Sequence, residues 1–281
     1  MSALPTVLGG RYCIERLLGA GGMGTVYRAR DLLQEQFGDP QPYVALKVLS
    51  EAYEQSPDAS ALLFNEYALM RHLHHPNVLR IYSFDVDTTH QRVFMVMELL
   101  RGPTLDRLLC ERPLGLGWSA LQEIALPLLD AVAHAHERGV LHGDLKPSNV
   151  LLSEDGVRLF DFGLGQAQAG TLDGLAPVSR SRVNAWTPGY AAPEILEGAA
   201  LTCVADVYAL GCLLYELASG KHPFNRQPAI RTRLKRPKNL PRHAWRAVRK
   251  ALALDPTKRT ISAAQLRTAL ATQPGFFARL L

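Results

Sequence analysis

Up to about residue 100, short runs of β-branched and aromatic residues alternate with Gly, Pro or polar residues, which is the pattern of short β-strands. We expect strands at residues 12–18, 25–29, 43–48, 78–84 and 93–98. One helix is predicted among them, at residues 61–73, with Glu66 close to its apolar stripe. That stripe consists of four residues at helical intervals: Leu62, Leu69, Met70 and Leu73.

Beyond residue 102 the hydrophobic period becomes helical. Helices are expected at residues 118–138, 202–219, 244–254 and 263–271. Pro127 lies inside the first of these and is expected to bend it or to start a new turn. The chain therefore predicts an α+β architecture, with a small sheet-rich lobe and a larger helical lobe joined near residues 98–102.

Composition is that of a globular protein, because 47% of the 281 residues are hydrophobic and 20% are charged. The start of the chain lacks the pattern of a signal peptide. The longest uncharged apolar run near the C-terminal half, residues 207–215, is far shorter than the ~20 residues that a membrane span requires. We expect a cytoplasmic protein without a membrane span. Its four scattered cysteines are expected to be small buried residues in a reducing compartment.

A glycine-rich segment, GAGGMG from Gly19 to Gly24, separates two of the predicted strands. A dinucleotide-binding fingerprint would open a helix, whereas Val26 and Tyr27 continue a strand. A tight glycine turn is the plain structural explanation. The alternative is a flap whose backbone N–H groups approach phosphate oxygens, since no side chains intervene.

Lys47 ends the segment VALK on a strand that is predicted to be buried. A buried ammonium needs partners, since burying an unpaired charge is costly. Glu66 on the following helix can supply one carboxylate and nucleotide phosphates can supply further oxygens. The structural alternative is a lysine whose ammonium reaches solvent beside an exposed glutamate.

The chain resembles bacterial eukaryotic-like (Hanks-type) serine/threonine protein kinases over residues 11–271. The resemblance is carried by RLLGAGGMGTVYRARD, by VALK, by HGDLKPSN at residues 142–149 and by DFG at residues 161–163. It implies a bilobal protein-kinase-like fold, with a small antiparallel-sheet N-lobe containing one main helix and a larger, mostly helical C-lobe. The implied boundaries are a single kinase domain over residues 1–281, with an N-lobe at about 11–98, a hinge at 98–102 and a C-lobe at about 103–273.

The resemblance also implies the residues of the site and its cofactors, ATP and Mg²⁺, with Mn²⁺ as an alternative. Lys47 would grip phosphates while paired with Glu66. Asp144 would orient the acceptor hydroxyl and take its proton, and Lys146 would steady the transferred phosphate. Thr187 and Lys146 would favour Ser or Thr acceptors over Tyr. The implied metal ligands are Asn149 and Asp161. The implied ATP-binding residues are Leu18, Gly19, Ala20, Gly21, Gly22, Met23, Gly24, Thr25, Val26, Ala45, Lys47, Met97, Glu98, Leu100 and Leu151.

Two other functions compete with this interpretation. HGD is also typical of small-molecule kinases that act on aminoglycosides or choline. Those enzymes lack the downstream segments TPGYAAPE, DVYALG and DPTKR, in which Glu194 is expected to pair with Arg259 and Asp206 to anchor the catalytic loop. A pseudokinase scaffold is the second alternative, although every charged group that the chemistry needs is present.

The sequence says less about the regulation and the partners of this protein than about its site. Most regulated relatives carry Arg where this chain has Gly143, and that Arg pairs with a phosphorylated activation segment. We therefore hypothesise that phosphates on Thr171, Ser179 or Ser181 matter little for activity. Residues 217–254 contain eleven Lys or Arg and no Asp or Glu, which indicates either a solvated face or a surface for an anionic partner. The expected partners are protein substrates, with a phosphatase or regulatory protein as further candidates, and no nucleic acid.

Overall fold

The computed structural model describes residues 5–20, 24–49, 57–168, 171–172, 189–227 and 234–272. The chain divides into two compact units. The first contains the described residues up to His74 together with Leu79–Arg101. The second contains His75–Val78, Gly102–Thr171 and the described residues from 189 onwards.

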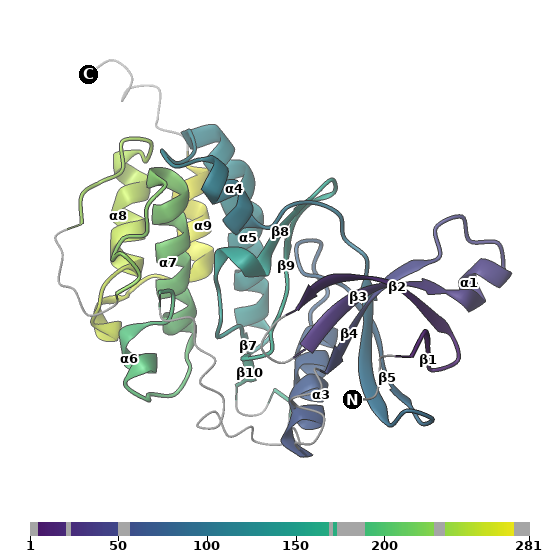
Figure 1. The fold of residues 1–281 in the computed structure, drawn as a ribbon. Helices are drawn as coiled ribbons and strands as arrows, with labels where there is room; N and C mark the ends of the chain where they lie inside the picture. Colours follow the sequence, from purple (N-terminus) through teal and green to yellow (C-terminus); the bar gives the residue numbers. More distant parts are fainter. Residues whose placement is uncertain are drawn as a thin grey trace. The chain divides into compact units, whose positions relative to one another are not determined.

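The first unit is built on a six-stranded antiparallel sheet, in the order β1-β2-β3-β4-β6-β5 (Figure 1). Its strands are β1 (Val7–Leu8), β2 (Tyr12–Ala20), β3 (Gly24–Asp31), β4 (Tyr43–Leu49), β5 (Ile81–Asp87) and β6 (Arg92–Glu98). The helix α3 (Pro57–Arg71) contacts β4, β5 and β6. The short helix α1 (Leu32–Gln36) begins where the Asp31 carboxylate caps the N–H groups of the first turn.

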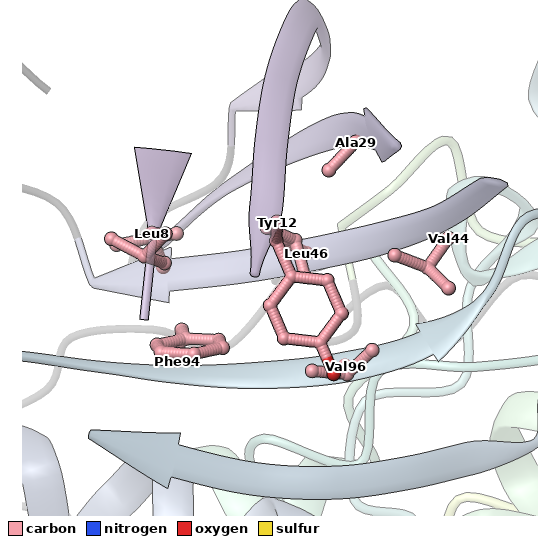
Figure 2. Packing of buried hydrophobic residues seen from close by; sticks show 8 residues of the cluster. Leu8, Tyr12, Ala29, Val44, Leu46, Phe94 and Val96 are labelled. Atoms are coloured by element: carbon pink, nitrogen blue, oxygen red, sulfur yellow. The ribbon is translucent and has the colours of Figure 1, made fainter. Parts of the chain in front are cut away.

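An apolar core forms on this sheet because alternate side chains of its strands point to one face. Figure 2 shows Tyr12, Val44, Leu46, Phe94 and Val96 packed together. The rings of Tyr12 and Phe94 meet edge to face, with their centroids 5.8 Å apart. This packing holds β4, the strand that carries Lys47, in the middle of the sheet.

The second unit is mostly helical. Its longer helices are α4 (Leu105–Glu111), α5 (Trp118–Glu137), α7 (Cys203–Ser219), α8 (Arg242–Ala251) and α9 (Ala263–Ala271). α7 is buried along most of its length and contacts α5 and α8, while α9 contacts α5 and α8 (Figure 1). The smaller elements are β7 (Val140–Leu141), η1 (Pro147–Asn149), β8 (Val150–Ser153), β9 (Gly156–Leu159), β10 (Gln166–Ala167), α6 (Pro193–Leu196) and η3 (Pro256–Lys258).

Several predicted boundaries were wrong. The strand expected at 78–84 is β5, Ile81–Asp87. Val78 belongs to the second unit and forms an isolated bridge there with Leu159 of β9. The helix expected at 61–73 begins at Pro57, because proline suits a first helical turn although it carries no apolar signal. The helix expected at 244–254 is α8, two residues earlier at its start and three at its end.

Two single residues carried expectations of their own. Pro127 was expected to bend its helix or to start a new turn, and α5 runs as one helix from Trp118 to Glu137 with Pro127 inside it. Cys110 is exposed, which contradicts the expectation that all four cysteines are buried; Cys212 is buried as expected. Within the described ranges, no helix combines the length and apolar character needed to cross a membrane.

Candidate active site

In the first unit, Lys47 and Glu66 form a buried ion pair. β4 places Lys47 and α3 places Glu66, and the Lys47 Nζ lies 2.7 Å from both carboxylate oxygens of Glu66. Lys47 is 9% and Glu66 3% exposed. Neither charge would be tolerated there alone, because desolvation of an uncompensated ion costs several kcal/mol. The pair therefore holds α3 in a fixed position against β4.

The glycine-rich segment joins the hairpin of β2 and β3. Gly19 lies opposite Val26 and Ala20 opposite Thr25, and a register shift between Leu17 and Gly19 leaves Leu18 unpaired in the ladder. Gly24 begins β3, where an added Cβ would lie 2.8 Å from the Val48 carbonyl oxygen. Only glycine lets β3 approach β4 this closely. Gly21, Gly22 and Met23 lie outside the described residues.

The predicted adenine-binding residues of this unit lie on β4 and at the end of β6. Ala45 and Met97 are buried and lie opposite each other in the β4–β6 ladder. The Glu98 N–H donates to the Arg80 carbonyl oxygen at 3.0 Å, and β6 ends at Glu98. Leu100 follows two residues later and is half-buried.

In the second unit, Asp144, Lys146 and Asn149 converge on the loop after β7. The Lys146 Nζ donates to the Asp144 Oδ2 at 2.5 Å. The Asn149 Nδ2 donates to the Asp144 backbone oxygen at 2.9 Å and lies 3.3 Å from its Oδ2. The short 3₁₀ helix η1 produces this convergence, since it turns the chain back so that Asn149 faces Asp144. A carboxylate, an ammonium and an amide are thus held together.

Asp206 of α7 fixes the backbone of that loop. Its carboxylate accepts hydrogen bonds from the N–H groups of His142 and Gly143, each at 2.9 Å, and lies 2.9 Å from the His136 Nε2. Burial alone would raise the pKa of Asp206, but the His136 contact and the backbone donors outweigh it and lower that pKa. Sequence reasoning predicted the Asp206 anchor.

His136 was not predicted as part of this network. Burial favours its neutral form, yet the hydrogen bond to Asp206 raises the pKa of His136 to about 9. The imidazolium therefore compensates the buried carboxylate. The sequence signal that could have found it is a histidine in the last turn of α5, shortly before the HGD segment.

Asp161 and Phe162 follow β9. Asp161 has a φ of 65°, a left-handed conformation that costs a non-glycine residue ~1–2 kcal/mol but that Asp tolerates better than most. The Phe162 ring is fully buried, with its centroid 4.4 Å from that of His142. The His142 Nε2 lies 3.2 Å from the Phe160 oxygen. Leu151, the remaining predicted ATP contact, lies half-buried on β8.

The expected pair of Glu194 and Arg259 is present in the second unit. The Arg259 guanidinium reaches both carboxylate oxygens, at 2.5 and 2.7 Å, and its side chain is 0% exposed. Arg259 also donates to the carbonyl oxygens of Ala253 and Leu254. The pair ties α6 to the segment before α9. Thr187, Ser179 and Ser181 lie outside the described residues.

A sheet unit that carries a Lys–Glu pair and a helical unit that carries an Asp–Lys–Asn loop are the features of a kinase-like domain. Comparison with known proteins agrees, because residues 12–269 match the model of the protein kinase domain. The chain belongs to the protein kinase domain family.

Individual relatives support the bacterial serine/threonine branch. The chain is 35% identical over 269 residues to the serine/threonine-protein kinase PkaA of Streptomyces coelicolor, covering 90% of this chain and 48% of PkaA. It is 33% identical over 225 residues to PknL of Mycobacterium tuberculosis, covering 80% of this chain and 53% of PknL. The chain thus spans about half the length of these relatives.

Among solved structures, the kinase domain of Mycobacterium tuberculosis PknI superimposes with a TM-score of 0.69 at 26% identity. The match covers 96% of this chain and 98% of that structure. The predictions of fold class and family are confirmed by these comparisons.

Proposed function

We propose that this chain transfers the γ-phosphoryl group of ATP to Ser or Thr hydroxyls of protein substrates. The single observation that carries the proposal is the loop in which Asp144, Lys146 and Asn149 converge. Protein kinases as a family use ATP and Mg²⁺ and act on proteins, and the curated relatives bear serine/threonine-kinase names. In the proposed domain, the two compact units are the N-lobe and C-lobe, with a hinge at residues 98–102.

Asp144 is proposed to bind the acceptor hydroxyl and to take its proton as the phosphoryl group is transferred. Lys146, 2.5 Å from the Asp144 carboxylate, would neutralise charge beside the acceptor. Asp206 supports this role at a distance, because it fixes the backbone N–H group of Gly143, the residue before Asp144. The transition state is loose and highly charged, so positioning and electrostatics supply most of the rate enhancement.

The donor set fits the proposed Mg²⁺ ligands. The Asn149 side-chain hydrogen bonds to Asp144 use its amide nitrogen, so the amide oxygen is the atom proposed for the cation. Asp161 adds a carboxylate, and Mg²⁺ prefers oxygen ligands, with phosphates and water completing its octahedron. When bound, the ion would neutralise phosphate charge, while Asn149 and Asp161 would hold it.

Residues of the first unit are proposed to hold ATP. Lys47, oriented by Glu66, would contact the α- and β-phosphates, and the described part of the glycine segment would cover them. Ala45 and Val26 would line the adenine, with Met97 behind it. Since the Glu98 N–H already donates to Arg80, the adenine contacts are assigned to the Glu98 carbonyl and to the Leu100 backbone.

The test is incubation with radiolabelled ATP, Mg²⁺ and a generic basic protein, followed by phosphoamino-acid analysis. Labelled Ser or Thr is expected, and Asp144→Asn should abolish the label. Asp155→Asn is the matched control, since Asp155 is an exposed carboxylate in the β8–β9 turn and should leave the rate unchanged. Nucleotide binding without transfer would indicate a pseudokinase. Label on kanamycin or choline instead of protein would indicate a small-molecule kinase.

A further inference from the structure

One side of α8 is lined with exposed cations. Arg242, Arg246, Arg249 and Lys250 are all exposed, at spacings that place them on a single helix face. The opposite face is buried against the unit through small apolar residues: Ala244, Ala247, Val248 and Ala251. α8 lies beside α7 in the helical unit (Figure 1). The helix therefore presents one continuous basic stripe.

Part of the stripe opposes the stability of its own helix. Arg242 is the first helical residue, preceded by Pro241, and the first turn holds no acidic residue to favour the positive end of the helix dipole. Arg242 and Arg246, and Arg246 and Lys250, are like-charged neighbours four residues apart, a spacing that destabilises helices. Arg249 and Lys250 lie in the last turn, where the helix dipole favours cations, so folding of α8 gives a reason for these two but none for Arg242 and Arg246.

A second group of cations lies next to the helix. Lys235, Arg236 and Lys238 are exposed in the segment before α8. The Tyr215 hydroxyl donates to the Lys235 carbonyl oxygen at 3.2 Å, and the Tyr215 ring lies 6.0 Å from the Trp245 ring of α8. Tyr215 thus touches both the segment and the helix and brings them together.

These seven residues constitute what we term the basic surface: Lys235, Arg236, Lys238, Arg242, Arg246, Arg249 and Lys250. None of the seven makes an ion pair with a carboxylate in the described ranges. Other exposed cations of the same unit do find carboxylates, as Lys258 does with Asp255 at 3.3 Å and Arg267 does with Asp130. The basic surface therefore gathers seven cations that no carboxylate of the described ranges neutralises.

We propose that the basic surface is a docking site for an Asp/Glu-rich segment of a protein substrate. Its arginines suit carboxylates because a guanidinium can bind both oxygens at once. The α8 stripe from Arg242 to Lys250 spans about 12 Å, roughly the length of four residues of an extended peptide. That the acidic protein is a substrate rests on the proposed kinase function; the binding itself does not.

Other anionic partners fit the described surface less well. None of the exposed large hydrophobic residues of the described ranges lies between residues 217 and 254, so the described part of that segment offers no large apolar side chain to insert into a lipid surface. Trp245 packs against Tyr215 and is only half-exposed, so it is no stacking platform for single-stranded nucleic acid. Duplex DNA and anionic vesicles are therefore alternatives for the test to reject.

The experiment measures binding of fluorescein-labelled peptides to the whole chain by anisotropy, without nucleotide, so that its result is independent of catalysis. The probes are a short Glu-rich peptide and its Gln analogue. The test variant carries three substitutions: Arg242→Gln, Arg246→Gln and Arg249→Gln. The control variant removes the same charge from exposed arginines elsewhere in the second unit: Arg107→Gln, Arg112→Gln and Arg138→Gln.

Saturable binding of the Glu-rich peptide is expected, with weakening at higher salt and no binding of the Gln analogue. The test variant should bind about tenfold more weakly, since each exposed ion pair contributes little and three are removed, while the control stays near wild type. Gln has a helix propensity close to that of Arg, so α8 should stay folded, which circular dichroism checks.

Equal loss of affinity in the two variants would show a general charge effect and would overturn the proposal. So would tighter binding of random-sequence duplex DNA or phosphatidylserine vesicles that is lost in the test variant alone. For the substrate role, the test variant should raise KM only for peptides that carry the acidic segment, with kcat on a plain Ser peptide unchanged. An unchanged KM for both peptides would overturn that role but not the binding.

Discussion

Replacement of Gly143 by alanine tests how the catalytic loop is held. Gly143 has a φ of +79°, and an added Cβ would lie 2.6 Å from the Leu164 carbonyl oxygen and 2.9 Å from a Leu201 methyl carbon. Its N–H group is held by Asp206, and Asp144 is the next residue. A side chain here must therefore move either the Leu164 backbone or the loop that carries Asp144.

The expected loss of unfolding free energy in Gly143→Ala has two parts, the left-handed conformation and the close approach. The left-handed conformation costs alanine ~1–2 kcal/mol, of which about 0.4–1 kcal/mol is offset because alanine reduces the freedom of the unfolded chain. The close approach adds about 1–3 kcal/mol, as is typical when a packed site must shift to accept an extra methyl group. We expect Gly143→Ala to lower the free energy of unfolding by about 2–4 kcal/mol.

Comparison with Gly198→Ala separates the cost of the close approach from the cost of the left-handed conformation. Gly198 has a comparable φ of +92° in the same unit, but nothing lies within 4 Å of an added Cβ. Urea unfolding followed by circular dichroism, with m-values compared, measures both variants. Gly143→Ala should exceed Gly198→Ala by about 1–3 kcal/mol.

Activity provides a second readout. A displacement of Asp144 by about 1 Å would lower kcat by roughly 100-fold, whereas Gly198→Ala should leave kcat near wild type. Equal unfolding free energies for the two variants, together with an unchanged kcat for Gly143→Ala, would refute the view that this glycine is required by close packing.

The hypothesis that phosphorylation of the activation segment matters little for activity has its own test. Turnover of the dephosphorylated enzyme is compared with that of the fully autophosphorylated enzyme, and a rise of several tens of fold would contradict the hypothesis.

Three further predictions concern buried charges. Lys47→Met should abolish most transfer and destabilise the fold by about 3–5 kcal/mol, since it strips the ammonium from the buried carboxylate of Glu66; adding Glu66→Gln should restore stability, measured by urea unfolding, but not activity. Glu194→Ala should cost a similar ~3–5 kcal/mol because it leaves the Arg259 guanidinium buried, and an unfolding midpoint equal to wild type would contradict this. The pKa of His136 is raised from 6.5 to about 9, so its contribution to stability is fully present below about pH 6.5 and is lost as the pH rises through about 9. The unfolding free energy should fall more steeply between about pH 6.5 and 9 in wild type than in His136→Gln.

Much of the site could be predicted from the sequence because its signals are local. The strand pattern around Lys47, the glycine segment before it and the HGDLKPSN segment each lie within a few consecutive residues, where alternation and spacing can be read directly. The pairing of Glu194 with Arg259 was also predicted, but only through resemblance to a family, since 65 residues separate the two in the chain.

Element boundaries were less predictable, because they depend on packing and not on periodicity. Val78 carries a strand-like pattern, yet it makes an isolated bridge to Leu159, and β5 begins only at Ile81. Pro57 opens α3 without an apolar signal. At Val78 a long-range contact outweighed the local pattern. At Pro57 the helix starts where proline suits a first turn, a preference that hydrophobic periodicity does not register.

By itself, the sequence determined the family, the residues proposed to carry the chemistry and the division into a sheet-rich and a helical part, since hydrophobic periodicity and short motifs are properties of neighbouring residues. Only the tertiary structure decided that His136 is charged at neutral pH and that a Cβ at Gly143 would meet Leu164. Both depend on atoms that distant segments bring within about 3 Å, where desolvation and steric repulsion act. No local pattern encodes those distances.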